Sequence, residues 1–265
     1  MKVVLFCGGL GLRLRDYSED LPKPMVRVGK HPILWQVMRY YAHFGHKEFI
    51  LCLGYKGEVI KDYFLHYEEC MSNDFILSDG GRRIELFNQD VEDWTITFVD
   101  TGIEANIGER LKAVQPHLEG EELFLANYTD GLTDLDLSQY LDFAKEQDRV
   151  ATFLSVRPTA TFHVVESDPD GSVTRISPVD EATRINCGYF VLKQQIFEEM
   201  REGDDLVTAP FQRLIEKRQL ATYNYDGFWE CMDTFKDRQM LEAMVRSGDK
   251  PWQVWAQKRA STGPS

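Results

Sequence analysis

The amino-acid sequence predicts an α/β fold, in which a doubly wound, mostly parallel sheet carries helices on both faces. Short apolar runs alternate with segments whose apolar residues recur at helical spacing, which is the pattern of strands joined by crossover helices. The first run, residues 2–7, ends directly in glycines, and the fourth ends in Asn-Tyr-Thr-Asp-Gly at residues 127–131. Ligands of such sheets lie beyond the carboxyl ends of the strands, so these two turns are where we expect a site.

The predicted elements follow one another without an internal repeat or a low-complexity segment. Apolar runs of strand length predict buried strands at residues 2–7, 49–53, 95–99, 123–126, 150–156, 187–192 and 221–225. Helical periodicity predicts helices from Ile33 to near Gly45 and at residues 55–64, 108–114, 137–146, 196–200, 210–217 and 235–245.

Two stretches interrupt this alternation. Residues 70–93 are polar, with Asp-Gly-Gly-Arg-Arg at 79–83 as their least structured part, so we expect a loop or hairpin excursion rather than a domain boundary. Residues 164–176 contain two short apolar runs around Asp-Pro-Asp-Gly, which predict a β-hairpin. The chain is therefore expected to form one domain over residues 1–255, followed by a flexible tail over 256–265.

The composition is that of a globular protein, with 43% hydrophobic and 28% charged residues among 265. The net charge of −13 argues against nonspecific nucleic-acid binding, which requires a broad basic face. A small anionic substrate is compatible with this charge because cations gather locally, at Arg13, Arg15, Lys23, Arg27 and Lys30. No apolar run approaches the length of a membrane span, and Met1 leads directly into a core strand, so we expect neither a signal peptide nor a membrane partner.

The cysteines are widely spaced, odd in number and without a Cys-x-x-Cys pair: Cys7, Cys52, Cys70, Cys187 and Cys231. Cys7 and Cys52 lie in apolar runs, where a thiol behaves as a small hydrophobe. The pattern predicts a reducing, cytoplasmic location without disulfides or structural zinc. His43 and His46, near the end of the first helix, could form a metal pair, although side chains facing the helix dipole are the interpretation we favour.

The first glycine-rich turn suits an anion. Glycines in Gly-Gly-Leu-Gly-Leu-Arg, residues 8–13, would let backbone N–H groups point into one concave space. The turn is not a P-loop, because Gly-x-x-x-x-Gly-Lys-Ser/Thr is absent. A dinucleotide fingerprint would need a glycine at Leu14, which argues against an NAD-dependent oxidoreductase. A plain turn explains the glycines alone equally well, but Arg13 and Pro-Lys-Pro at 22–24 favour a polyphosphate site.

Together with Pro-Lys-Pro-Met at residues 22–25, this turn resembles the signature of the sugar-phosphate nucleotidyltransferases. Further motifs are similar to those of the glucose-1-phosphate cytidylyltransferases within that family. They are Pro-Ile-Leu-Trp at 32–35, Gly-Tyr-Lys-Gly at 54–57, Val-Asp-Thr-Gly at 99–102, Gly-Glu-Arg-Leu-Lys at 108–112, Met-Asp-Thr at 232–234 and Pro-Trp at 251–252. Each motif is weak alone, but their number and order, from Met1 to about Trp255, make the resemblance specific. It implies a Rossmann-like nucleotidyltransferase fold.

The resemblance also implies a nucleotide site with a Mg²⁺ ion. It places the metal on Asp130 and Asp233, gives Lys23 the α-phosphate and Arg13 the departing β- and γ-phosphates, and adds Arg110, Gly8, Gly9 and Gly11. The chemistry is reasonable, because two carboxylates about 4 Å apart repel by roughly 1 to 4 kcal/mol and a Mg²⁺ ion would remove that repulsion.

Other roles are open for the same residues. Asp130 could be a turn residue, Asp233 a helix N-cap, and Lys23 and Arg13 solvated cations. Asp134 and Asp136 are expected to be loop and capping residues.

The chain departs from the family mainly on the acceptor side, around the hairpin at 164–176, which would form a smaller β-rich excursion. Where the family usually has Glu-Lys-Pro, whose lysine holds the sugar phosphate, this chain has Ile-Ser-Pro-Val at 176–179. His163 replaces a glycine of the sugar pocket, and Leu12 replaces a threonine near the phosphates. The remaining candidates for acceptor binding are Asn186 of Asn-Cys-Gly and the flanking Arg175 and Arg184, which could replace the lysine or be solvated.

The leading hypothesis is therefore a Mg²⁺-dependent cytidylyltransferase, in which CTP and a phosphorylated acceptor give CDP-acceptor and pyrophosphate. The acceptor need not be glucose 1-phosphate, and another NTP could replace CTP. The alternative is a noncatalytic paralogue that binds nucleotide sugars, which the missing Glu-Lys pair would favour. A homo-oligomer is expected, because family members associate and because Trp252 and Trp255 would be exposed unless something covers them.

Overall fold

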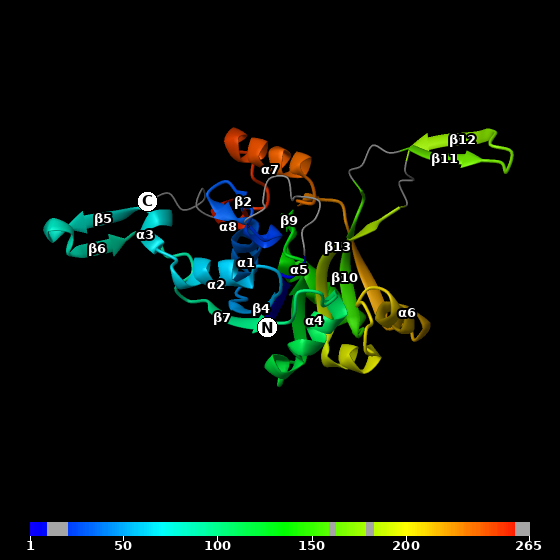
Figure 1. Ribbon diagram of the computed structural model, residues 1–265, viewed down its shortest axis with the longest axis horizontal. Helices are drawn as coiled ribbons and strands as arrows, with labels where there is room; N and C mark the ends of the chain where they lie inside the picture. Colours follow the sequence, from blue (N-terminus) through cyan, green and yellow to red (C-terminus); the bar gives the residue numbers. More distant parts are fainter. Residues whose placement is uncertain (10–20, 159–162, 179–182, 258–265) are drawn as a thin grey trace.

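The computed structural model describes residues 1–9, 21–158, 163–178 and 183–257. Its centre is a seven-stranded sheet in the order β14-β10-β13-β8-β1-β4-β7 (Figure 1). The strands are β1 (Val3–Phe6), β4 (Glu48–Leu53), β7 (Thr95–Asp100), β8 (Leu123–Asn127), β10 (Ala151–Val156), β13 (Ile185–Lys193) and β14 (Leu220–Tyr225). Strand β13 runs antiparallel to its neighbours β10 and β8, and the other pairings of this sheet are parallel. The predicted α/β class with a mostly parallel sheet is confirmed.

The central strand β1 is buried on both faces of the sheet. Val3 and Leu5 belong to the core cluster on one side, and Val4 and Phe6 belong to the cluster on the other. Successive side chains of a strand point to opposite faces, so a strand covered on both faces must be apolar throughout. This is why the strands could be recognised from uninterrupted apolar runs.

Helices pack against the sheet in both clusters. Helices α1, α2, α5 and α7 pack on the face of Val3, whereas α4, α6 and the 3₁₀ helix η5 pack on the face of Val4. The bounds are α1 (Ile33–His43), α2 (Gly57–Leu65), α3 (Glu69–Ser72), α4 (Ile107–Ala113), α5 (Leu137–Gln147), α6 (Ala209–Glu216), α7 (Phe235–Ser247) and α8 (Val254–Gln257). The 3₁₀ helices are η2 (Lys23–Met25), η3 (Asp79–Gly81), η4 (Gln115–Leu118) and η5 (Gln194–Glu199). The helix predicted at residues 196–200 is thus the 3₁₀ helix η5.

Four two-stranded ribbons lie outside the main sheet in the described part of the chain. They are β2 (Arg27–Val28) with β3 (His31–Pro32), β5 (Phe75–Ser78) with β6 (Arg83–Leu86), β9 (Gly131–Thr133) with β15 (Trp229–Cys231), and β11 (His163–Ser167) with β12 (Val173–Pro178). The β5–β6 and β11–β12 ribbons project from opposite ends of the molecule (Figure 1). They confirm the hairpins predicted within residues 70–93 and 164–176.

The C-terminal tryptophans are covered by the chain itself. Trp252 is only 1% exposed and stacks on Phe228, with ring centroids 5.8 Å apart. Trp255 packs edge-on against Trp35 of α1 at 6.2 Å. The chain itself thus supplies the cover, so these two side chains give no support to the predicted homo-oligomer, which stays a prediction. Residues 256–257 of the predicted tail are helical, and residues 258–265 lie outside the described residues.

Three of the cysteines are buried thiols, Cys7, Cys52 and Cys187. Burial raises the pKa of Cys52 to about 12, so this thiol behaves as the small hydrophobe that its apolar run predicts. Among the described helices, none combines the length and the apolar character that crossing a membrane requires.

His46 has a neutral ring at physiological pH, because burial, helped by the N-terminal ammonium and Lys145, lowers its pKa from 6.5 to about 4. As the pH falls from 6.5 to 4, His46 is protonated in the unfolded chain but stays neutral in the folded chain. The free energy of unfolding must therefore decrease over this window. After discounting for solvent screening, we expect His46→Gln to abolish about 1 to 2 kcal/mol of that acid-induced loss. Urea unfolding at pH 7 and pH 4.5 measures this, and an unchanged acid-induced loss in His46→Gln would contradict the account.

Candidate active site

Three charged residues from distant parts of the sequence meet beyond the ends of the central strands. The Lys23 ammonium donates to the Asp130 carboxylate, with Nζ 2.7 Å from Oδ2, and also to the carboxylate of Asp233. Lys23 comes from η2, Asp130 lies between β8 and β9, and Asp233 lies between β15 and α7. The structure thus brings together three of the residues predicted from the sequence, and all three side chains are partly exposed.

The β9–β15 ribbon is what brings the two carboxylates together. Its register pairs Gly131 with Cys231, and the backbone N–H of Met232 donates to the carbonyl of Asp130 at 2.8 Å. Asp130 and Asp233 therefore flank the same end of one backbone ladder. Sequence patterns missed this ribbon, because strands of three residues are too short to display a period.

Lys23 is held by its neighbours in the chain. Pro22 and Pro24 fix two backbone φ angles, and Pro24 and Met25 are buried. The N–H of Met25 donates to Pro22 O at 2.8 Å, and the N–H of Val26 donates to Lys23 O at 3.1 Å. The segment is therefore a fixed turn, and the ammonium is directed at the two carboxylates instead of being solvated at the surface.

Asp233 is not the N-cap of α7. Thr234 occupies that position, and it forms a capping box with Asp237, whose carboxylate also accepts from the backbone N–H of Asp233. The capping alternative for Asp233 is therefore wrong, and its carboxylate pairs with Lys23 instead. Asp136 caps α5, and Asp134 accepts from the N–H of Phe228, so both have the loop and capping roles predicted for them.

The cluster carries one negative charge in excess, since two carboxylates face one ammonium. Burial raises the pKa of Asp130 and the charge of Asp233 adds to this, while Lys23 opposes it. Burial alone would lower the pKa of Lys23, but Asp130 and then Asp233 outweigh it, so the pKa of Lys23 is raised. Carboxylate oxygens with uncompensated charge suit a hard divalent cation such as Mg²⁺, which takes one or two protein carboxylates and leaves its other positions to substrate phosphates and water.

Thr129 connects the two strand ends beside this cluster. It is buried and left-handed, with φ +67°, a conformation that is unfavourable for a β-branched residue. Its N–H donates to Asn127 Oδ1 at 2.7 Å and its hydroxyl donates to Phe6 O at 2.9 Å. These bonds tie β8 to β1 and fix the direction of the next residue, Asp130. A threonine directly before Asp-Gly at a strand end was the available signal, and pattern reasoning did not use it.

Arg110 lies against Gly8, directly after the end of β1. Its guanidinium is buried and donates to Leu53 O at 3.1 Å, to the Thr101 hydroxyl at 2.7 Å and to Ile103 O at 3.2 Å. A Cβ added at Gly8 would lie 2.0 Å from the Arg110 guanidinium carbon. Gly8 is therefore needed to make room for Arg110, which joins the ends of β1, β4 and β7. A nucleotide contact of Arg110 remains a prediction.

The rest of the predicted phosphate turn is described only in part. Gly9 is exposed, with φ +140°, a backbone conformation that glycine adopts readily. Gly11 and Arg13 lie outside the described residues, so their phosphate contacts also remain predictions.

The acceptor candidates are spread apart. Asn186 lies beside Tyr128, two residues before Asp130, with Nδ2 3.5 Å from the tyrosine oxygen. Arg184 pairs with Asp226 at 2.7 Å and donates to Tyr225 O. Arg175 is exposed on the β11–β12 ribbon and pairs with Glu166 at 3.5 Å. The backbone of His163 begins β11, opposite Pro178. Among the described side chains of this set, only Asn186 lies next to the strand end that carries Asp130.

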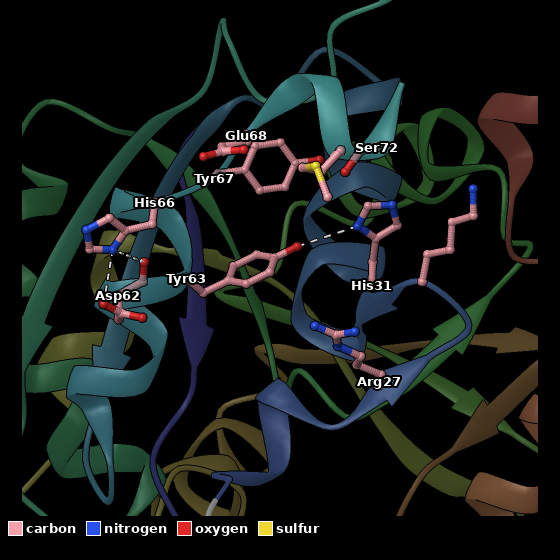
Figure 2. Close-up of a pocket in the computed structure, with 10 residues that line it drawn as sticks. Arg27, His31, Asp62, Tyr63, His66, Tyr67, Glu68 and Ser72 are labelled. Atoms are coloured by element: carbon pink, nitrogen blue, oxygen red, sulfur yellow. Dashed lines mark hydrogen bonds and ion pairs between the residues drawn. The ribbon is translucent and has the colours of Figure 1, made fainter. Parts of the chain in front are cut away.

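A cavity of about 520 Å³ lies elsewhere, between the β2–β3 ribbon and helices α2 and α3. Figure 2 shows Tyr63 of α2 pointing across it toward His31, with Nδ1 of the ring 3.5 Å from the tyrosine oxygen. Lys23, Asp130 and Asp233 do not line this cavity. The candidate active site is therefore the carboxylate–lysine cluster at the carboxyl ends of the strands, where ligands of open α/β sheets bind.

Comparison with known proteins agrees with this fold. The chain belongs to the nucleotidyl transferase family, whose model matches residues 2–246. It is 37% identical over 260 residues to the glucose-1-phosphate cytidylyltransferase of Salmonella typhi, covering 96% of this chain and 100% of that protein. It is 25% identical to the mannose-1-phosphate guanyltransferase of Candida albicans, over 89% of this chain and 62% of that protein.

The fold is shared with solved structures of low sequence identity. A crystal structure of UDP-glucose pyrophosphorylase complexed with UDP-glucose superposes with a TM-score of 0.67 at 13% identity, covering 93% of this chain and 98% of that one. The resemblance stated from the motifs is thus confirmed, and the protein is a nucleotidyltransferase.

The buried position of Arg110 yields a test of stability. We expect Arg110→Met to lower the free energy of unfolding by about 2 to 4 kcal/mol, because it leaves buried carbonyl oxygens without donors. Arg175→Met, at an exposed site, should change it by less than about 0.5 kcal/mol. Urea titration of both variants makes the comparison, and an equal effect of the two would contradict a structural role for Arg110.

Proposed function

We propose that this chain transfers a cytidylyl group from CTP to a sugar 1-phosphate, with Mg²⁺ as cofactor, giving a CDP-sugar and pyrophosphate. The observation that carries the proposal is the Lys23 ammonium held between the carboxylates of Asp130 and Asp233. Such a cluster offers a binding site for a divalent cation and a fixed positive group, and phosphoryl transfer requires both. The strong similarity to cytidylyltransferases supports CTP as the donor.

The chemistry is one displacement at phosphorus. A phosphate oxygen of the acceptor attacks the α-phosphorus of the nucleotide, the bond from that phosphorus to the bridging oxygen breaks, and pyrophosphate leaves with the electron pair. No covalent bond to the protein is required, so positioning and charge stabilisation supply the catalysis. Mg²⁺, when bound, would neutralise charge on the phosphate oxygens.

The residues of the chain divide this work. Asp130 and Asp233 would hold the metal, since their joint charge exceeds that of the ammonium between them. A divalent cation held by the same carboxylates would compete with Lys23, which would leave the ammonium available for the α-phosphate and its developing charge. Arg13 is proposed to stabilise the departing pyrophosphate, and the backbone N–H groups of Gly8, Gly9 and Gly11 to face the phosphates.

The acceptor side of the chain departs from the family pattern. Ile176 and Ser177 occupy the place of the Glu-Lys pair expected from the family. Neither candidate for a replacement cation is unpaired, since Arg184 bonds Asp226 and Arg175 bonds Glu166. We therefore propose a sugar 1-phosphate that differs from glucose 1-phosphate in size or shape. A noncatalytic nucleotide-sugar-binding protein is the second candidate, favoured only by this missing pair.

The metal ligands are tested by neutral isosteres. Asp130→Asn and Asp233→Asn should each lower Mg²⁺-dependent pyrophosphate release by at least about a hundredfold and leave the circular dichroism spectrum unchanged, because they remove charge without volume. Asp142→Asn, on the exposed face of α5, is the matched control and should be fully active. Normal turnover of both active-site variants would refute the assignment.

The role of Lys23 is tested by separating kcat from KM. Lys23→Ala should reduce kcat by about a hundred- to a thousandfold, since a cation that acts on transition-state charge is worth several kcal/mol. Lys145→Ala, exposed on α5, should leave kcat unchanged. A change of KM alone would mean that Lys23 only helps to bind the nucleotide.

The acceptor is tested by screening CTP, UTP, dTTP, ATP and GTP against a panel of sugar 1-phosphates for pyrophosphate release. We expect CTP to be preferred and glucose 1-phosphate to be at least about tenfold less efficient than the best acceptor, because a lost charge-assisted bond is worth about 1.5 to 3 kcal/mol. A kcat/KM near or above about 10⁴ M⁻¹s⁻¹ with glucose 1-phosphate would overturn the altered-acceptor proposal. No release with any pair would favour the noncatalytic alternative.

A further inference from the structure

The cavity between the β2–β3 ribbon and helices α2 and α3 has no part in the proposed reaction. Its volume of about 520 Å³ lies within the range of about 300 to 1,000 Å³ that is usual for small-molecule sites. Arg27, Lys30 and His31 line it from the ribbon, whereas Asp62 and Glu68 line it from α2 and the turn after α2. Figure 2 shows the two carboxylates across the cavity from Arg27 and His31. The cavity is therefore positively charged on one side and negatively charged on the other.

The two cations of the ribbon have no counterion in the described part of the chain. Neither Arg27 nor Lys30 forms an ion pair or a hydrogen bond with a described residue, and both side chains are exposed. On the opposite side, Asp62 is engaged by His66, with Oδ1 3.0 Å from Nδ1. A phosphate group suits the ribbon side, because arginine binds phosphate through two parallel N–H groups and lysine binds it as a point charge.

Uncharged hydrogen-bonding groups lie beside these cations. Burial lowers the pKa of His31; Asp90 opposes this effect, and Lys30 and then Arg27 add to it. The His31 ring is therefore neutral at pH 7, and its Nδ1 lies 3.5 Å from the hydroxyl oxygen of Tyr63. A neutral imidazole and a phenol each offer one donor and one acceptor, so the ester oxygens of a bound phosphate would find hydrogen-bond partners here.

The middle of the cavity presents ring and apolar surface. The rings of Tyr63 and Tyr67 pack nearly at right angles with centroids 5.7 Å apart, and Met71 lies beside them in the lining. Beyond them, the carboxylate of Glu68 can accept hydrogen bonds from hydroxyl groups. The molecule that fits this sequence of groups has a phosphate at one end and a hydroxyl-bearing ring at the other.

The ribbon that carries the cations is held in place by the rest of the chain. The N–H of Gly29 donates to the Glu242 carboxylate of α7 at 2.9 Å, and the N–H of Ile33 donates to Val26 O at 2.9 Å. The cationic side of the cavity is thus preformed, which lowers the cost of binding. The ribbon follows η2 directly, so it is continuous with the segment that positions Lys23.

We infer that this cavity is a second ligand site, which binds a small phosphate ester with its phosphate on Arg27 and Lys30 and its hydroxyl groups toward Glu68. The inference does not rest on the proposed function, because Lys23, Asp130 and Asp233 do not line the cavity.

The experiment is isothermal titration calorimetry of the full-length protein with glucose 6-phosphate, whose phosphate is not at the position used by a sugar 1-phosphate. The wild type should bind one equivalent. Arg27→Met and Lys30→Met should each weaken binding at least about tenfold, because each removes a charge-assisted contact. Arg83→Met is the matched control, since this arginine is exposed on β6 away from the cavity, and it should bind like the wild type.

Two further ligands separate the parts of the recognition. Glucose, which lacks the phosphate, should not bind, and inorganic phosphate, which lacks the ring, should bind at least about tenfold more weakly than glucose 6-phosphate. NMR titration of His31 should move to higher pH when glucose 6-phosphate is present, because a bound anion favours the imidazolium.

Three results would overturn the inference. The first is that glucose 6-phosphate and inorganic phosphate both fail to bind the wild type. The second is that glucose 6-phosphate binds Arg27→Met and Lys30→Met as tightly as the wild type. The third is that its binding is lost in Asp130→Asn, which would place the ligand in the candidate active site instead.

Discussion

The candidate site depends on one backbone ladder of three residue pairs. The β9–β15 ribbon joins the segment after β8 to the segment before α7, and the bond from Met232 N–H to Asp130 O continues the ladder to the two acidic residues. Without this pairing, the electrostatic repulsion between the carboxylates of Asp130 and Asp233 would keep them apart. The ladder holds them at a distance where one cation can be shared, and Lys23 is the cation that the structure places there.

The ladder can fix the two carboxylates only if the strand ends beside it are rigid. Two side chains, those of Arg110 and Thr129, hold these strand ends together. The Arg110 guanidinium contacts the ends of β1, β4 and β7. The Thr129 hydroxyl joins the end of β8 to β1 by a hydrogen bond. Both residues are in an unfavourable local state. Arg110 has a buried guanidinium, and Thr129 is a β-branched residue with a left-handed backbone. Such conflicts persist only where the surroundings fix the geometry, and they cluster at functional sites. The glycine at position 8 is explained by the same packing, since any larger residue would collide with Arg110.

The fold could be predicted from the sequence because the central strands are covered on both faces. Continuous apolar runs such as residues 3–6 and 123–126 follow directly from that burial. Pro-Lys-Pro, Asn-Tyr-Thr-Asp-Gly and the Met-Asp-Thr motif of the family resemblance marked the three active-site segments. What failed depends on long-range contacts. The β9–β15 pairing joins segments about a hundred residues apart, and the burial of Arg110 depends on space left by Gly8. No local pattern encodes these contacts, because each needs a partner that is distant in sequence.

The central claim is that a divalent cation and the Lys23 ammonium compete for the same two carboxylates. The most direct measurement is the binding of Mn²⁺, followed by electron paramagnetic resonance, to the wild type and to Lys23→Met. Removing a positive charge about 4 Å away is worth about 1 kcal/mol or more, so the variant should bind Mn²⁺ at least about fivefold more tightly while losing its turnover. Equal or weaker binding of Mn²⁺ by Lys23→Met would contradict the claim.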